Sequence, residues 1–113
     1  MKARFLRDKN GKVDSGWGIP ESGEYIKDLE YGRIIIPYIK NLYNVVTITI
    51  NGIHYKQIKV CVLQFLAWHG VIEKGHVIHH KDDNRLNDCE NNLESLLRKV
   101  HSSHHNLGRI RHH

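Results

Sequence analysis

The clearest pattern of apolar and polar positions lies in the middle of the chain. Segments 33–39 and 44–60 are dense in β-branched and aromatic residues, which favour strands. Within the second segment, Asn51-Gly52 is a strong signal for a two-residue hairpin turn. A hairpin closed at this turn places four apolar side chains on one face: Ile48, Ile50, Ile53 and Tyr55. The pattern therefore predicts an antiparallel β-hairpin.

Beyond this hairpin face the apolar positions change phase and then change spacing. Ile58 and Val60 no longer continue the alternation, so we expect a bulge near Gln57 or a strand that turns over into the next element. In residues 62–70, VLQFLAWHG, the apolar spacing is closer to that of a short buried helix than to that of a strand. Gly70 is well placed to end such a helix.

The C-terminal part combines short apolar segments with a polar loop. Residues 76–80, HVIHH, have the pattern of a short strand, whereas residues 82–92, DDNRLNDCENN, are rich in Asp and Asn and favour turns. Segment 93–97, LESLL, fits either a strand or the start of a helix. We expect a helix over residues 99–106, because of the spacing of the histidines there.

The first 32 residues are predicted to form a basic, irregular arm. They are rich in Gly and in charge, and five cations precede residue 13: Lys2, Arg4, Arg7, Lys9 and Lys12. A chain of 113 residues has room for one modest core and little else. We therefore expect residues 33–113 to form a single folded domain.

The overall charge favours polyanionic partners such as nucleic acid. The chain has 17 Lys and Arg against 12 Asp and Glu, a formal net charge of +5. No apolar run approaches the roughly 20 residues of a membrane-spanning helix, and the N-terminus lacks the core of a signal peptide. We expect a cytoplasmic protein with no membrane partner. Cys61 and Cys89 are too isolated to form a disulfide framework or a Cys-rich zinc site, so any metal must be held by His, Asn or Asp.

Two histidine clusters flank the polar loop. On a helix, His101 and His105 are four residues apart and share a face, so both imidazoles can bind one metal ion, and His104 is a competing ligand. In a strand, His79 and His80 point to opposite sides and should have different roles. If His79 joins the helical histidines as a ligand, His80 remains an unliganded imidazole beside the metal, as a general base for hydrolysis must be.

Each cluster alone has a simpler explanation. Adjacent histidines are usually a surface feature, and an H-x-x-x-H spacing on a helix is more often not a metal site. The two clusters together, joined by a polar loop in a basic chain, favour a metal-assisted phosphodiester hydrolase over a structural zinc site.

The run VIHHKDDNRLNDCENNLESLLRKVHSSHHN resembles the HNH nuclease motif of small phage and homing endonucleases, V-x-H-x-D-G-N-x-x-N-N-x-x-x-N-L-x-x-x-[TS]-x-x-x-[HN]. The upstream hairpin and helix agree, so the resemblance covers residues 33–106. Several spacings hold at once, because Asn92 follows His80 by twelve residues and His101 follows Asn92 by nine. One departure is Asp83, which stands where the family has Gly and must avoid positive φ or accept strain of about 1 kcal/mol.

The resemblance implies an α+β fold, in which a small antiparallel hairpin or sheet with a short helix (33–70) is followed by a ββα-metal finger (76–106). It also implies one divalent metal ion, Zn, Mn or Mg, held by three histidines: His79, His101 and His105. His80 matches the general base, and Asn92 matches the residue that pins the loop and the base in place. By the same resemblance, segment 93–97 is the second strand of the finger.

The implied activity is that of a metal-dependent DNA endonuclease that nicks DNA or cuts both strands with weak specificity. DNA is the expected partner of a monomer or homodimer, in the host cytoplasm if the chain is phage-encoded. Four cations are candidates for phosphate contact: Arg98, Lys99, Arg109 and Arg111. Two alternatives remain open, a nucleic-acid-binding module with a structural zinc and an inactive member of the family.

Overall fold

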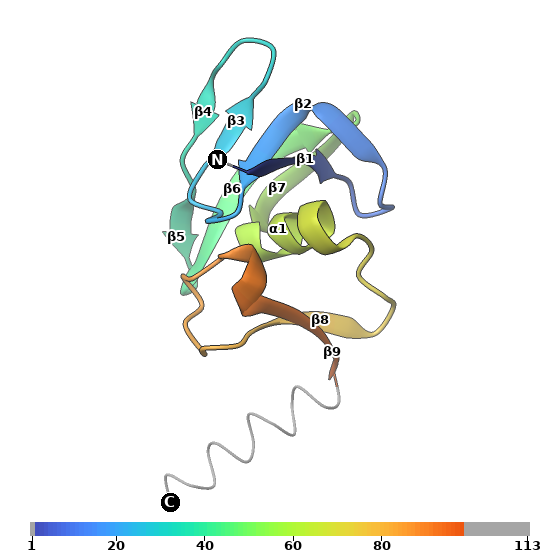
Figure 1. Ribbon diagram of the computed structural model, residues 1–113, viewed down its shortest axis with the longest axis vertical. Coiled ribbons are helices and arrows are strands. Elements are labelled where there is room, and N and C mark those ends of the chain that lie inside the picture. The colour runs from blue at the N-terminus through green and yellow to red at the C-terminus, as the bar shows by residue number, and fades with distance from the viewer. Residues whose placement is uncertain (1, 99–113) are drawn as a thin grey trace, which may run out of the picture.

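A computed structural model describes residues 2–98 of the chain (Figure 1). These residues form three antiparallel sheets and one α-helix, α1 (Val60–His69). The arrangement is α+β, as the sequence predicts. Within the described part, no helix is both long enough and apolar enough to cross a bilayer.

The first sheet is built almost entirely from the N-terminal residues. Its strands, in spatial order, are β1 (Ala3–Arg7), β2 (Val13–Pro20), β3 (Ile26–Asp28) and β4 (Ile34–Ile35). The prediction of an irregular arm over residues 1–32 was therefore wrong, and the boundary after residue 32 is absent because β4 pairs with β3. Leu6, Ile19 and Ile26 are completely buried. They lie too far apart in the sequence to give a local pattern, but their shared burial stabilises the sheet.

The second sheet contains the predicted hairpin. Its strands are β5 (Tyr38–Lys40), β6 (Tyr43–Ile50) and β7 (Ile53–Lys59). The predicted register is confirmed, since Ile50 pairs with Ile53 and Ile48 pairs with Tyr55. The bulge expected near Gln57 is also present: the register shifts opposite this residue, and its φ is 54°.

Helix α1 follows β7 directly and lies between the sheets, as Figure 1 shows. Its sequence is apolar on most sides, which is typical of a buried helix. One side packs on the core made by the first two sheets, through Val60 and Leu63. Another side packs on the C-terminal hairpin, where Phe65 contacts Leu93 in a second apolar cluster. Gly70 ends the helix with a φ of 91°, and its N–H donates to the Leu66 carbonyl at 3.1 Å, as the sequence predicts.

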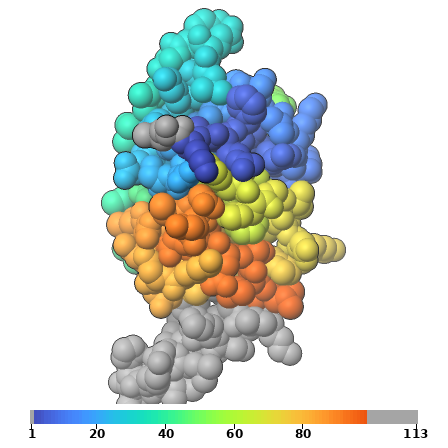
Figure 2. Space-filling model, in the orientation of Figure 1, coloured from blue at the N-terminus to red at the C-terminus, as the bar shows by residue number. Residues whose placement is uncertain are grey.

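The N-terminal sheet also supports the polar loop of the C-terminal part. In Figure 2 the N-terminal residues (blue) lie above residues 81–98 (orange). Between them, the buried Gln64 donates from Nε2 to the carbonyls of Glu21 at 2.9 Å and Asp88 at 3.0 Å. Gly23 has a φ of 68°, and a Cβ at this position would lie 2.7 Å from the Asp88 carbonyl oxygen. A residue with a side chain there would push the loop away.

Candidate active site

The C-terminal part forms a two-stranded antiparallel hairpin with a long polar connection. Strand β8 (His76–His80) pairs with β9 (Leu93–Leu97), so that His79 faces Glu94 and His80 faces Leu93. A short 3-10 helix, η1 (Glu90–Asn92), precedes β9. Segment 93–97, which the residues alone left open, is therefore a strand. The predicted strand–loop–strand order is confirmed.

Side chains of the loop hold its own backbone in consecutive turns. The Asp82 carboxylate accepts from the Asn84 N–H at 2.9 Å, and the Asn84 side chain accepts from the Leu86 N–H at 3.0 Å. Asn87 accepts from the Cys89 N–H at 3.3 Å. Asp and Asn form such turns readily, because their short side chains reach the backbone two residues on. The composition of the loop therefore specifies its shape.

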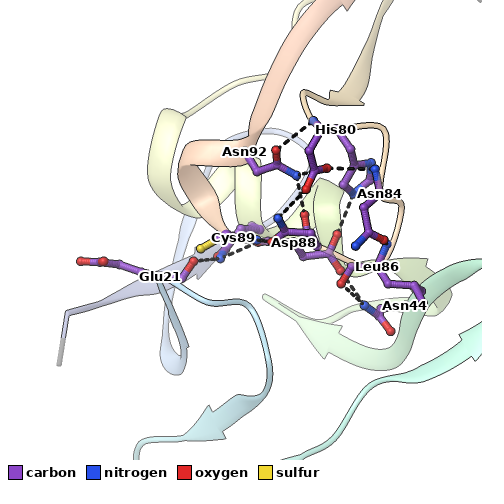
Figure 3. Close-up of polar contacts among 11 residues, drawn as sticks. Glu21, Asn44, His80, Asn84, Leu86, Asp88, Cys89 and Asn92 are labelled. Carbon is purple, nitrogen blue, oxygen red and sulfur yellow. Dashed lines mark hydrogen bonds and ion pairs between the residues drawn. The ribbon is translucent and has the colours of Figure 1, made fainter.

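Asn92 fastens this loop to the hairpin (Figure 3). Its Nδ2 donates to Asp82 Oδ1 and to the Asn87 carbonyl, each at 2.9 Å, and its Oδ1 accepts from the Asp82 N–H at 3.1 Å. The side chain is nearly buried, and its backbone carbonyl accepts from the Lys81 N–H at 2.8 Å. One amide thus joins the two ends of the loop.

These contacts stabilise the ionised form of Asp82. Hydrogen bonds from the Asn87 side chain, the Asn84 N–H and the Asn92 side chain lower the pKa of Asp82 from 3.8 to about 2. A carboxyl group whose folded pKa is depressed stabilises the fold above its unfolded pKa. It loses that contribution as the pH falls through the folded pKa.

We therefore expect a pH-dependent difference between the wild-type protein and Asp82→Asn in thermal melts. At neutral pH the variant should melt at a lower temperature, because the Asn87 amide loses its carboxylate acceptor. The difference should shrink as the pH falls from about 4 to about 2, where Asp82 becomes protonated in the wild type. A difference that stays constant over this window would contradict the assignment.

His80 is held by a buried carboxylate. Its Nε2 lies 2.8 Å from Asp88 Oδ1, and the exposed fractions of the two side chains are 4% and 3%. An ionised carboxylate only accepts hydrogen bonds, so Nε2 is the donor, and a neutral ring then has its lone pair on Nδ1. Asp88 Oδ2 accepts from Asn44 Nδ2 at 3.0 Å, which ties the pair to β6. The imidazole is therefore almost completely buried, with Asp88 and the Tyr43 ring beside it.

His79 has carboxylates at both ring nitrogens. Nδ1 lies 3.1 Å from Glu94 Oε2, and Nε2 lies 3.3 Å from Asp83 Oδ1. A metal-bound histidine commonly donates its other ring N–H to a carboxylate, and Glu94 is placed for this. Nε2 and the Asp83 carboxylate are then two adjacent donors of types that divalent transition metals accept. The residues present therefore fit a divalent cation.

The backbone at Asp83 has the positive φ that is costly for a residue other than Gly. Its φ is 61°, in the left-handed region, so the strain of about 1 kcal/mol expected for a non-Gly residue is present. In return, the position gains a carboxylate beside His79 that Gly cannot supply.

Several predicted site residues lie outside the described part of the chain: Lys99, His101, His105, Arg109 and Arg111. The predicted helix over 99–106 and the competing His104 lie there too. Within residues 2–98, the structure brings His79, His80 and Asn92 together on one hairpin. Arg98 is exposed at the end of β9.

Sequence reasoning missed Asp88, which holds His80, and Asn44, which holds Asp88. It also missed Asp83 as a neighbour of His79. Asp88 lies eight residues after His80 in a loop of similar residues, so its sequence gives no signal of its role. Asn44 lies on a different sheet. At Asp83 the sequence did give a usable signal. Where the family has Gly, this chain has a residue with a carboxylate, four positions after the predicted ligand His79.

A basic cleft of about 600 Å³ adjoins this hairpin, and three cations line it: Lys9, Lys59 and Arg98. Tyr43, also in the lining, has Lys59 Nζ 3.9 Å from its ring centroid. The Arg85 guanidinium lies 5.4 Å from the same centroid. The Tyr43 and His80 ring centroids are 6.2 Å apart, so the cationic groups of Lys59 and Arg85 lie close to His80.

Two comparisons with known proteins find similarity between this chain and HNH endonucleases. Residues 60–103 match a family model described as HNH endonuclease. The fold is similar to a solved chain from a structure described as DNA binding and cleavage by the HNH homing endonuclease I-HmuI. That match has a TM-score of 0.70 and 21% sequence identity, and it covers 92% of this chain and 57% of the other. No curated protein sequence gives a significant match.

The predicted resemblance to HNH endonucleases is therefore confirmed over α1, β8, the loop and β9. The fold of the described residues is similar to that of the I-HmuI chain. This chain spans 57% of the length of the I-HmuI chain.

Proposed function

We propose that this chain is a metal-dependent DNA endonuclease that hydrolyses phosphodiester bonds, nicking DNA or cutting it with weak specificity. The observation that supports this most directly is the pairing of two histidines in the segment that matches the HNH model. His80 is fixed by Asp88, and the adjacent His79 has a carboxylate at each ring nitrogen. This arrangement suits a general base beside a cation site.

In this proposal His80 accepts a proton from the attacking water at Nδ1. Asp88 orients the ring and stabilises the imidazolium that forms, because its carboxylate already accepts the Nε2 proton at 2.8 Å. Asn92 keeps the loop, and with it Asp88, in place. The developing hydroxide then attacks the scissile phosphorus on the side opposite the leaving 3′ oxygen. The bond between phosphorus and the 3′ oxygen breaks, and this oxygen takes a proton from solvent.

The metal would be held by His79, with His101 and His105 as the further ligands predicted from the resemblance and Asp83 as a neighbouring donor. The chemistry that a divalent cation bound there would supply is polarisation of the phosphate and stabilisation of negative charge in the transition state. Imidazole ligands suit Zn and Mn better than Mg, although each of the three ions remains a candidate.

DNA would lie across the basic cleft. Lys59 and Arg98 line it, and Lys59 and Arg85 contact the Tyr43 ring next to His80. Lysine and arginine side chains neutralise phosphates and position the backbone without reading the sequence. Lys99, Arg109 and Arg111 are proposed to extend this contact.

The test is a supercoiled-plasmid assay with the purified protein and Mg²⁺, Mn²⁺ or Zn²⁺, each with and without EDTA. We expect conversion to the nicked form with at least one metal, and complete loss of conversion in EDTA. Cleavage that persists in EDTA would contradict a metal-dependent reaction. Binding of the plasmid without cleavage under all conditions would instead favour the nucleic-acid-binding module or an inactive relative.

A further inference from the structure

Three side chains from different elements converge behind the proposed base. Cys61 comes from the first turn of α1, His80 from the end of β8, and Asp88 from the loop. Each offers one donor atom of a kind that binds metal ions, and the three atoms lie within 4.8 Å of one another. All three residues are buried. The proposed nuclease mechanism uses His80 and Asp88 but gives Cys61 no role.

The charges of these groups match a borderline-soft divalent cation. Thiolate, imidazole and carboxylate are the three ligand types of protein zinc sites. One thiolate and one carboxylate balance Zn²⁺, and a neutral imidazole adds no charge, so the buried assembly would be neutral. A neutral assembly avoids the large cost of an unpaired buried charge. Ligands of a tetrahedral zinc lie roughly 3.5 Å apart. Because the three donor atoms all lie within 4.8 Å of one another, the largest closure that any pair needs is about 1.3 Å.

In the absence of a cation the thiol is firmly protonated. Burial, together with the nearby negative charge of Asp88, raises the pKa of Cys61 to about 12. Binding of Zn²⁺ would release this proton to solvent as the Zn–S bond forms.

We propose that Cys61, His80 and Asp88 form a second cation site, selective for Zn²⁺ over Mg²⁺ and Mn²⁺, whose occupation switches the nuclease off. A neutral imidazole has a single lone pair. Whichever nitrogen of His80 binds zinc, the ring then has none left to accept a proton from water. The inhibitory half of this inference rests on the proposed nuclease function, whereas the existence of the site does not.

The site is tested by adding Co²⁺, a spectroscopic substitute for Zn²⁺, to the purified full-length protein. A thiolate ligand gives a sulfur-to-cobalt charge-transfer absorption in the near ultraviolet, which oxygen and nitrogen ligands do not give. We expect this absorption in the wild type, in Cys89→Ser and in His79→Ala, and its loss in Cys61→Ser. Cys89→Ser is the matched control, because it removes the other free thiol. No absorption in the wild type, or absorption that survives Cys61→Ser, would overturn the site.

If Cys61→Ser does not fold, X-ray absorption of the zinc-loaded wild type replaces the comparison. One sulfur in the coordination shell of zinc, retained in Cys89→Ser, supports the site, and a shell of nitrogen and oxygen alone overturns it.

The inhibition is tested by adding Zn²⁺ to Mn²⁺-supported plasmid nicking. We expect zinc to inhibit the wild type and Cys89→Ser, and Cys61→Ser to need at least roughly tenfold more zinc, as expected when a ligand is lost. Equal inhibition of Cys61→Ser would assign the effect to zinc at His79 and overturn the switch. Nicking supported by zinc alone would also overturn it. If no metal supports nicking, the nuclease proposal fails, while the cobalt absorption still decides whether the site exists.

Discussion

Replacement of His80 by Ala should reduce plasmid nicking by roughly 10²–10⁴-fold, the usual cost of removing a general base. The physical reason is that the ring's Nδ1 lone pair, left available by the Nε2–H donated to Asp88, is the proposed acceptor for the water's proton. Binding of Mn²⁺, measured by electron paramagnetic resonance, should change little, because His79 and Asp83 remain.

The alanine variant also leaves the Asp88 carboxylate without its buried partner, so a second variant separates chemistry from folding. His80→Gln retains an N–H donor toward Asp88 but has no basic nitrogen, and its nicking rate should fall by a similar factor. His54→Ala is the matched control, since His54 is exposed on β7 and contacts only Thr49 among the interactions described for it. Undiminished cleavage by folded His80→Gln would remove His80 from the role of base.

The elements that were predicted correctly are those with local signals. Asn51-Gly52 forms the hairpin turn. The strands on either side of it pair with each other in the expected register. The phase change before Ile58 predicted the bulge, which arises because Gln57 takes a positive φ. Helix α1 and its end at Gly70 follow from apolar spacing and from the freedom of Gly to adopt a φ of 91°.

The N-terminal sheet could not be predicted in this way. Its buried positions Leu6, Ile19 and Ile26 are separated by charged and Gly-rich segments, and what makes them core residues is contact with β6, β7 and α1. Such long-range packing leaves no periodic trace in the sequence. The same holds for Gln64, whose amide ties this sheet to the loop at Asp88.

The candidate site shows a similar division between local and long-range information. The resemblance indicated His79, His80 and Asn92, and all three lie on or beside the C-terminal hairpin. It did not indicate that Asp88 would hold the His80 ring or that Asn44 would hold Asp88 from another sheet. Nor did the small number of cysteines suggest that Cys61 would lie against this pair. These contacts depend on where α1 and β6 are placed in the fold.

Replacement of Asn92 by Ala should be the most destabilising change in the loop. It removes the hydrogen bonds to Asp82 and Asn87 and leaves the Asn87 carbonyl and the Asp82 N–H without these partners. At about 1 kcal/mol for each bond, the free energy of unfolding should fall by about 3 kcal/mol. For a domain of this size, the melting temperature should then fall by roughly 10–20 °C. Thermal denaturation followed by circular dichroism measures the change.

Asn91→Ala is the matched control, because Asn91 is the exposed neighbour of Asn92 and should melt within a few degrees of the wild type. Asn92→Asp distinguishes hydrogen bonding from packing, since it keeps the shape but places a second carboxylate against Asp82 Oδ1. This variant should be destabilised at neutral pH and should approach the wild type as the two carboxyls become protonated, because protonation removes their repulsion. If Asn92→Ala melted like Asn91→Ala, the loop would be held by its own Asx turns, and the position of Asp88 behind His80 would not depend on Asn92.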